Sequence, residues 1–354
     1  MPWMRRDGAP PRRLCLNVPE GHVIHGLARE LNRHFAGKAV AVSSPQGRFA
    51  QEAALFDGRI LDRATAFGKH LFLVFDAPVA AADPQAAAQE TPGDPAAPTV
   101  IYIHLGLIGT FRIEPAHPPV GQVRLRLTEA DSPTTVADLR GPQWCRIIHP
   151  TEMDRIVSRG ADPLLAPPPA DPEVGEGPLS HQVATRAAED YHGRHRMPPG
   201  TIEHVSSSAP GGACRPEQVE EVLATARRSR RSVGTLLMDQ KLFPGVGNIY
   251  RAEVLFRAGI DPHTPGNQLS AQQWRWIWDD LVVLMHAGMR VGHIDTVRPA
   301  HTPEAMHRPR REDDHGGEVY VYRRAGQPCH VCGATIASAV MQGRNLFWCP
   351  SCQG

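Results

Sequence analysis

The last 26 residues of the chain contain four cysteines, arranged as two pairs with two residues inside each pair. Cys329 pairs with Cys332 and Cys349 with Cys352, and sixteen residues separate the two pairs. Each CxxC turn lets two thiolates approach one tetrahedral ion, and the residues between the pairs can form a hairpin. Because all four ligands are cysteines, no coordination position stays open for water. We therefore predict one structural Zn²⁺, and the alternative is four unrelated thiols.

Two further features could bind phosphate. Arg344 lies between the cysteine pairs, at the expected tip of the zinc-bound hairpin, where a guanidinium suits bidentate contact. The motif Gly245-Val-Gly247-Asn248 opens a helical pattern, and a helix N-terminus offers backbone N–H groups and a positive dipole end to an anion. Asn248 could cap this helix or donate to the phosphate. The alternatives are a solvated arginine and an ordinary helix start.

In their order along the chain, these motifs resemble those of the formamidopyrimidine-DNA glycosylase / endonuclease VIII family. Residues 236–256 resemble its helix–two-turn–helix, and the terminal cysteines resemble its zinc finger. Further matches lie at 104–109, 138–140 and 161–164. The resemblance runs from Pro19 to the C-terminus. It implies an α+β fold with an N-terminal β-sandwich and flanking helix, a C-terminal helical domain with the helix–two-turn–helix, and a terminal four-cysteine zinc finger.

The family's hallmark is an N-terminal Pro-Glu pair, which Pro19-Glu20 matches. The resemblance implies that the proline amine attacks C1′ of the damaged nucleotide, forms a Schiff base and opens β- and δ-elimination of the flanking phosphates. A free α-amino group with a pKa of about 7.7–8.0 is partly neutral at physiological pH. Glu20 matches the carboxyl that protonates and deprotonates the opening sugar. Lys69, one of three lysines, matches the lysine that contacts the backbone at the lesion, and Arg344 completes the expected catalytic set.

Pro19 is internal in this sequence, and an acylated proline nitrogen has no nucleophilic lone pair. Val18 precedes it, and an internal valine is what a GTG codon encodes, whereas GTG at a start site is read as methionine. We therefore expect translation to begin at residue 18, with removal of the methionine exposing the Pro19 amine. The alternatives are proteolytic trimming and a family member without catalysis.

A departure from the family pattern indicates which kind of damaged base the chain excises. The purine-specific branch usually carries Arg-Arg-Phe-Gly after the aspartate, whereas this chain has Arg140-Gly-Pro-Gln-Trp-Cys145. Leu107 occupies the position of the apolar wedge that replaces the extruded base. This resembles the endonuclease VIII-like branch, in particular its actinobacterial members. The resemblance implies DNA contacts by a set of four residues, which are Leu107, Arg140, Gly247 and Asn248.

The resemblance therefore predicts a bifunctional DNA glycosylase and abasic-site lyase of base excision repair. We expect it to act as a monomer on damaged double-stranded DNA and to favour oxidised pyrimidines. One alternative is an 8-oxoguanine/formamidopyrimidine glycosylase. Another is a protein that binds damaged DNA without cutting it, if Pro19 stays internal. A zinc-ribbon interaction module unrelated to DNA is the third.

Hydrophobic periodicity predicts the elements that position these residues. After Pro19, apolar side chains at helical spacing predict a helix that ends before Gly37; they are Ile24, Leu27, Leu31 and Phe35. Strand-like runs follow at 71–75, 99–105, 110–113 and 123–127, and the last, which alternates apolar residues with arginine, is expected to be half-buried. Helical patterns cover 217–231, 233–239, 248–258 and 270–289, with Ser270 as an N-cap and Trp274 and Trp278 in the core. A last short strand is expected at 319–322.

Five regions follow from these patterns. Residues 1–18 are an extension, which is not translated if translation begins at residue 18. The regions after it are a catalytic β-sandwich domain (19–150), a linker with a Pro-rich insert (151–215), a helix–two-turn–helix domain (216–315) and the zinc finger (316–354). Low-complexity residues 77–98, read as an expanded hairpin tip, and residues 167–215 carry few large apolar side chains, so we expect both to be mobile.

Composition limits the compartment and the mode of DNA binding. The 38 basic and 37 acidic residues give a net charge of +1, so any DNA contact depends on a few local groups. No stretch approaches the ~20 apolar residues of a membrane span, and no secretory signal is recognisable. Seven cysteines, an odd number, argue against a disulfide framework. We expect a bacterial cytoplasmic protein at the nucleoid, with no membrane partner.

Overall fold

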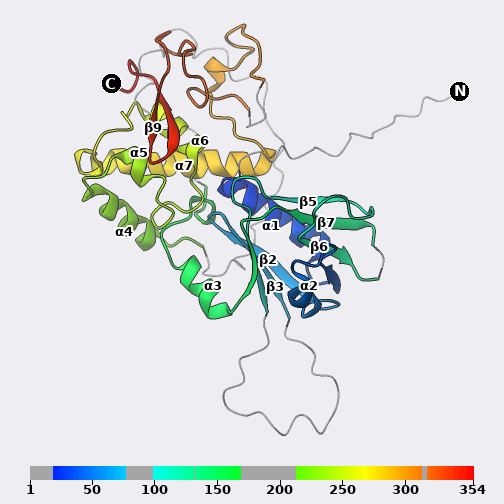
Figure 1. Cartoon of the computed structure of the whole chain (residues 1–354). Helices are drawn as coiled ribbons and strands as arrows, with labels where there is room; N and C mark the ends of the chain where they lie inside the picture. Colours follow the sequence, from blue (N-terminus) through cyan, green and yellow to red (C-terminus); the bar gives the residue numbers. More distant parts are fainter. Residues whose placement is uncertain (1–18, 77–98, 132, 169–212, 313–316) are drawn as a thin grey trace, which may run out of the picture.

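A computed structural model describes residues 19–76, 99–131, 133–168, 213–312 and 317–354 (Figure 1). The expectations for residues 1–18 and 77–98, and for most of 167–215, lie outside the described residues. Figure 1 shows a part rich in strands, a part rich in helices beside it, and a small hairpin against the helices at the C-terminal end.

The strand-rich part is built from two four-stranded antiparallel sheets. One sheet has the order β1 (Val40–Ser43), β6 (Leu125–Glu129), β7 (Thr135–Arg140) and β5 (Thr110–Pro115). The other has the order β2 (Leu61–Phe67), β3 (His70–Phe75), β4 (Val100–His104) and β8 (Trp144–Ile148). Leu73 and Ile101 of the second sheet share one core with Leu125 and Leu127 of the first. The expected β-sandwich is therefore confirmed, as is the antiparallel pairing of β3 with β4 on either side of 77–98.

Helix α1 (Gly21–Phe35) links this sandwich to the helical part. The apolar residues that predicted it are buried in the sandwich core, and the helix also contacts α7. Gly37, two residues beyond its end, has φ +72°, the left-handed conformation that commonly terminates a helix. Two short helices, α2 (Ala50–Ala54) and α3 (Pro150–Val157), complete this part of the molecule.

One strand is more buried than its sequence pattern predicted. Arg126 lies in β6 and its side chain is buried, although alternation with apolar residues suggested a solvent-facing position. Its guanidinium donates two hydrogen bonds of 2.7 Å to the carboxylate of Asp138. A bidentate pair of this kind satisfies both charges inside the fold, so arginine in an alternating pattern did not report exposure here.

The helical part contains α4 (Pro216–Arg227), α5 (Val233–Leu236), α6 (Asn248–Ala258) and α7 (Ala271–Val291), with the 3-10 turns η2 (Pro163–Leu165), η5 (Gly266–Gln268) and η6 (Pro299–His301). Trp274 and Trp278 are buried in its core, and Ser270 caps α7, as predicted. The predicted helix 217–231 instead ends at Arg227. Residues 229–231 form a turn in which the Arg231 carbonyl accepts from Gly266, a contact that needs tertiary structure.

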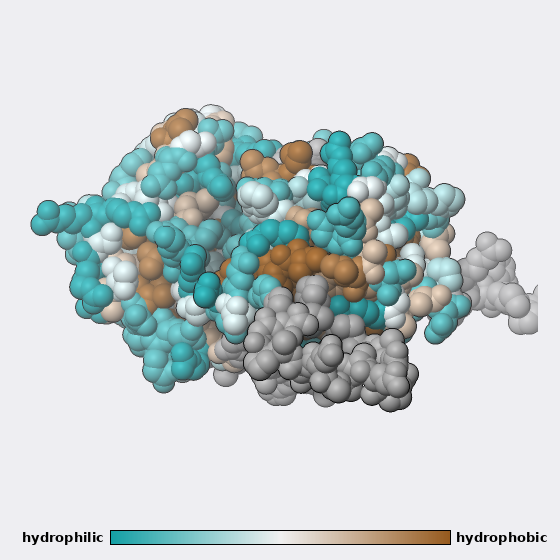
Figure 2. Space-filling model, turned by 60° about the horizontal axis from the view of Figure 1, so that its bottom comes forward, coloured by the Kyte–Doolittle hydropathy of each residue, from teal (hydrophilic) through white to brown (hydrophobic). Residues whose placement is uncertain are grey.

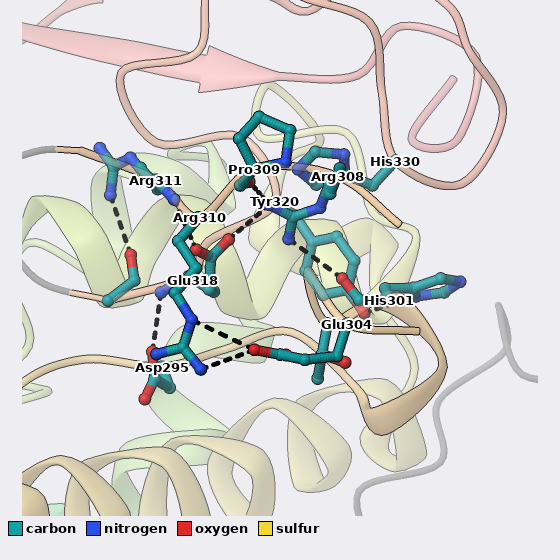
Figure 3. Close-up of polar contacts among 12 residues, drawn as sticks. Asp295, His301, Glu304, Arg308, Pro309, Arg310, Arg311, Glu318, Tyr320 and His330 are labelled. Carbon is teal, nitrogen blue, oxygen red and sulfur yellow. Dashed lines mark hydrogen bonds and ion pairs between the residues drawn. The ribbon is translucent and has the colours of Figure 1, made fainter. Parts of the chain in front are cut away.

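The segment that leads to the hairpin is held by buried side chains, and it is not the strand that was expected at 319–322. Glu253 of α6 accepts hydrogen bonds from the backbone N–H groups of Tyr320, Val321 and Tyr322 at 2.7–2.9 Å. These donors therefore bind a carboxylate and not a partner strand. Ion pairs between Arg308 and Glu318 and between Arg310 and Glu304 tie down the preceding residues, and Figure 3 shows this network.

The hairpin consists of β9 (Ala337–Met341) and β10 (Arg344–Trp348). Its two turn residues, Gln342 and Gly343, have φ of 50° and 72°, as in the two-residue turns that suit strand twist. None of the helices in the described part of the chain is both long and apolar enough to cross a membrane. On the face drawn in Figure 2, apolar residues gather in a recessed band bordered by hydrophilic ones.

Candidate active site

The carboxylate of Glu20 lies at the N-terminus of α6, although 227 residues separate it from Gly247 in sequence. It accepts hydrogen bonds from the backbone N–H groups of Gly247 at 3.1 Å and Ile249 at 2.9 Å, and a longer one from Tyr250 at 3.5 Å. Free N–H groups and the positive helix end favour a negative charge at this position. The geometry thus holds Glu20 in one orientation.

This contact corrects the sequence-based interpretation of the glycine motif. The N–H groups of Gly247 and Ile249, expected to receive a DNA phosphate, are bonded to the chain's own carboxylate. A Cβ atom on Gly247 would lie 2.5 Å from Oε1 and 2.6 Å from Cγ of Glu20, so the motif requires glycine here. Gly21 is equally constrained, because its Cβ would lie 2.9 Å from Cα of Gly245. The glycines therefore allow the start of α1 to pack against the start of α6.

Lys69 lies in the turn between β2 and β3 and points towards the same place. Its ammonium donates to the carbonyl of Val246 at 3.0 Å. Burial lowers the pKa of Lys69, Glu20 opposes this shift and Arg344 adds to it, and the resulting pKa is about 8. Burial also raises the pKa of Glu20, against the effect of Lys69 and of the three N–H groups. The site thus holds a carboxyl that protonates more readily than usual beside an amine that loses its proton more readily than usual.

Pro19 is buried and directly precedes this carboxyl. The backbone N–H of Gly21, the residue after Glu20, donates to the carbonyl of Gly245 at 2.9 Å, and this bond fixes the chain where it enters α1. Pro19, the Glu20 carboxyl and the Lys69 ammonium therefore lie together at the junction of α1, α6 and the β2–β3 turn, with the Pro19 nitrogen an amide in this chain. Proton transfer to and from a substrate held at this junction is what such a set can perform.

The zinc-finger hairpin meets α6 at its first turn. Asn248 donates its side-chain amide to the carbonyl of Asn345 at 2.8 Å, and Arg251 donates to the same carbonyl at 3.1 Å and to the Asn248 side-chain oxygen. Asn248 is the first residue of α6, not its cap, which is Gly247. Arg344 follows the hairpin turn and is exposed. The hairpin thereby presents Arg344 on the same side as Lys69.

The two remaining predicted DNA contacts lie on the β-sandwich. Leu107 is 74% exposed in the loop between β4 and β5, and its neighbour Ile108 is 85% exposed. Apolar side chains so open to water are suited to insertion between bases. Arg140 ends β7 and is more constrained, because it donates to Asp138 at 2.7 Å and to the Val120 carbonyl at 3.2 Å.

Two residues that the sequence analysis did not single out position this site. Asp162 is buried and accepts from the Gly68 N–H at 2.6 Å and from His25 at 2.9 Å, which fixes the turn that carries Lys69. Gln240 bridges the Gly245 N–H and the Val246 carbonyl within the glycine motif. Both belong to motifs quoted for the family resemblance, but only the fold shows what their side chains bind.

The four terminal cysteines converge as their spacing predicted. Their sulfur atoms all lie within 4.8 Å of one another, with 3.5 Å between Cys332 and Cys349 and 3.9 Å between Cys329 and Cys352. Zinc–sulfur bonds of about 2.3 Å in a tetrahedron imply sulfur–sulfur distances of about 3.8 Å. Backbone N–H groups also point at two of the sulfurs, as expected around thiolates. The donor set therefore fits zinc.

Comparison with known families gives three consecutive matches along the chain. They are the formamidopyrimidine-DNA glycosylase N-terminal domain (18–144), its H2TH domain (209–298) and the zinc finger found in FPG and IleRS (326–354). Endonuclease 8 1 of Mycobacterium tuberculosis is 39% identical over 348 residues, covering 95% of this chain and 100% of that protein. A formamidopyrimidine-DNA glycosylase of Parasynechococcus marenigrum is 38% identical over 128 residues, covering 36% of this chain and 44% of that protein.

Solved structures show the same fold. Lactococcus lactis formamidopyrimidine-DNA glycosylase, non-covalently bound to DNA with an AP site, aligns with a TM-score of 0.60 and 16% identity over 94% of this chain and 99% of that one. MutM from Thermus thermophilus aligns with a TM-score of 0.58 and 21% identity over 95% and 99%. The full-length identity to endonuclease 8 1 and the three family matches agree, and the chain belongs to the formamidopyrimidine-DNA glycosylase / endonuclease VIII family of DNA glycosylases and lyases, which carry a zinc finger and act in base excision repair.

Proposed function

We propose that this chain removes oxidised bases, pyrimidines in preference to 8-oxoguanine, and then cleaves the abasic site through a Schiff base on Pro19. The observation that carries the proposal is the buried Glu20 carboxyl, held by the start of α6 directly after Pro19 and beside Lys69. An amine, a proton donor and a cation at one point are the groups that this reaction needs.

Each group then has one task. The free nitrogen of Pro19 attacks C1′ as the bond from C1′ to the base breaks, and the base leaves with the bonding electrons and takes up the proton that the proline nitrogen loses. Glu20 gives its proton to the ring oxygen, so the sugar opens and the C1′–nitrogen iminium forms. The Glu20 carboxylate, now deprotonated, takes a C2′ proton as the 3′ phosphate leaves, and loss of a C4′ proton to solvent expels the 5′ phosphate in a second elimination. Water finally hydrolyses the iminium and releases the Pro19 amine.

The raised pKa of Glu20 supports its role as the donor. A carboxyl with a raised pKa keeps its proton to higher pH than a solvated one, so more of the enzyme is in the donating form near neutrality. Lys69, with a pKa of about 8, is mostly protonated at neutral pH and can bind the phosphate beside the lesion. We propose Arg344 and Asn248 as further phosphate contacts, Leu107 as the wedge, and Arg140 as a contact through its remaining N–H groups.

The four-cysteine site supports a structural role for one zinc ion, proposed here as the only metal. When bound, the ion would cross-link the ends of the hairpin that carries Arg344, and no catalytic step passes through it. We further propose that the protein acts as a monomer on damaged double-stranded DNA in the bacterial cytoplasm, at the nucleoid. The five sequence-based regions, from the extension at 1–18 to the zinc finger at 316–354, remain our proposed domain division.

Borohydride trapping on abasic-site DNA tests the mechanism, because reduction of the iminium links the protein covalently to DNA. Two forms are compared: the chain from Met1, and a chain in which methionine replaces Val18 as the first residue and is then removed. The family match that begins at residue 18 supports the second form as the active one. We expect trapping only where Pro19 is the first residue. We expect none in the same form when it carries Pro19→Ala and its N-terminus is acetylated.

Efficient trapping by a protein shown by mass spectrometry to keep Met1 would refute the role of Pro19. Binding without trapping by both forms would instead favour a protein that recognises damage without cutting it. The lesion preference is tested separately, by comparing the excision rate of thymine glycol with that of 8-oxoguanine in the same duplex. Faster excision of 8-oxoguanine would favour the purine-specific alternative.

A further inference from the structure

Trp144 is 52% exposed, and it is the only aromatic residue among the strongly exposed large hydrophobic side chains of the described part of the chain. Among the described residues, none makes a ring contact or a hydrogen bond with its indole. Burial of an aromatic ring is a large source of stability, and Leu107 and Ile108 are also strongly exposed, so Trp144 is not an isolated open side chain. Trp144 also belongs to the run 140–145 in which this chain departs from the purine-specific pattern.

Trp144 begins β8, the edge strand of its sheet, and lies directly opposite His104 of β4. The pairing extends one step further, because the N–H of Gln143 donates to the carbonyl of Leu105 at 3.3 Å. Beyond that pair the β4–β5 loop carries the exposed Leu107. The indole therefore stands at the base of the loop that holds the proposed wedge.

Trp144, His104 and His70 form a row of side chains across one face of the sheet, which leads from Trp144 to the candidate active site. Residues opposite one another in neighbouring strands share a face, so Trp144 and His104 lie on the same side of the sheet. The His104 and His70 rings have centroids 5.4 Å apart, and His70 follows Lys69 directly. Two strand spacings of about 4.8 Å place Trp144 roughly 10 Å from the strand that Lys69 precedes. That distance equals about three nucleotide steps of 3.4 Å, the rise along one strand whose bases keep the stacking of the double helix.

The charges beside this row suit a nucleic acid strand. Lys69 lies at one end, and Arg146, which is next on the same face of β8, stacks its guanidinium 5.1 Å from the centre of the Tyr102 ring. Aromatic faces with cations alongside are the usual means of binding unpaired bases, since every base offers a π-face. Two carboxylates lie near this row and both are bonded within the fold: Glu152 to Arg146, and Asp162 to His25 and the Gly68 N–H.

We propose that Trp144 stacks on an unpaired nucleobase of the lesion-bearing strand, about three nucleotides from the lesion, and so adds binding of lesions in single-stranded or locally opened DNA to the proposed action on duplex DNA. The proposal rests on the proposed glycosylase function, because that function brings the lesion to Glu20 and Lys69. A base inside an intact duplex is already stacked on its neighbours and cannot receive the indole, so the contact distinguishes opened from closed DNA.

The test measures binding of the full chain to an oligonucleotide with a tetrahydrofuran abasic analogue, single-stranded or in duplex. Removal of base–aromatic stacking, as in Trp144→Ala, should weaken single-strand binding about 5- to 100-fold. Duplex binding should change by less than about 3-fold, since no unpaired base is offered there. Trp144→Phe should restore most of the affinity, and Leu55→Ala, which alters a side chain of similar exposure (54%), should have no effect.

The position of the contact is read with 2-aminopurine, whose emission falls on stacking. Placed three nucleotides from the analogue on the lesion strand, it should be quenched by the wild-type chain and not by Trp144→Ala. Unchanged single-strand affinity, equal losses on both DNAs, or quenching only on the opposite strand would overturn the proposal. Borohydride trapping of the chain with Pro19 at its N-terminus separates the stacking proposal from the proposed lyase function. If trapping persists in Trp144→Ala and the wild type shows no quenching, only the stacking role is refuted. If the wild type shows quenching but no trapping, only the lyase function is refuted.

Discussion

Substitution of Gly247 by alanine should disable the site by displacing Glu20, without replacing any of the reacting groups. An added Cβ would lie 2.5 Å from Oε1 and 2.6 Å from Cγ of Glu20, and closer still to its Cδ. Ordinary carbon contacts are about 3.5–4.0 Å, so the carboxyl must move by about 1 Å or more. The obstacle is a buried side chain at a helix start, with little freedom to withdraw.

The size of the effect follows from the bonds that are lost. Displacement breaks the hydrogen bonds from Gly247 and Ile249, and each bond to a charged group is worth about 1.5–3 kcal/mol. General acid–base catalysis contributes about 10²- to 10⁴-fold, so the lyase rate should fall by about 10²-fold or more. Overpacking should also lower the free energy of unfolding by about 1–3 kcal/mol.

Single-turnover cleavage of abasic-site DNA measures the rate, and thermal unfolding measures the stability. Gly26→Ala is the matched control: nothing lies within 4 Å of its added Cβ, so the rate should be unchanged and α1 slightly more stable, by up to about 1 kcal/mol. The double variant Gly247→Ala/Glu20→Ala removes the obstacle and should recover stability but not activity. A wild-type rate for Gly247→Ala, or no recovery of stability in the double variant, would refute the reasoning.

Three other outcomes are expected. DNA binding should weaken as pH rises through about 8, because Lys69 carries its charge below that pKa and loses it above. Lys69→Met should remove this pH dependence, and a pH dependence of DNA affinity that survives the substitution would contradict the prediction. Cys349→Ser, or removal of zinc by a chelator, should lower the melting temperature and the DNA affinity together. Cys145 lies outside the four-cysteine set, so metal analysis of Cys145→Ser should give the wild-type zinc content. Arg344→Ala should reduce the affinity for abasic DNA and lower the slope of log affinity against log salt by about one. Arg48 is an exposed arginine of the sandwich, and Arg48→Ala should do neither; equal effects would mean that Arg344 contributes only general charge.

Much of the fold follows from local sequence patterns. The apolar spacing after Pro19 requires one buried helical face, and α1 has it. The strands β3 and β4, α6 and α7 with its Ser270 cap also correspond closely to their predicted ranges. These elements form where periodicity and capping agree, because both act over a few residues.

The predictions that failed depended on partners distant in sequence. Residues 319–322 have the composition of a strand, but Glu253 takes their N–H groups. Arg126 alternates with apolar residues as an exposed side chain would, but Asp138 neutralises it inside the sandwich. Local propensity cannot report a buried carboxylate contributed by another element.

The same division holds at the site. Sequence by itself determined the residue types: four cysteines at zinc-finger spacing, a Pro-Glu pair, a rare lysine and a glycine motif before a helix. Only the tertiary structure decided what the glycines serve, because the group bound at the start of α6 is the Glu20 carboxyl, from the opposite end of the chain. A motif specifies which groups are available, whereas burial and contact between distant segments decide which group each N–H meets and how far each pKa moves.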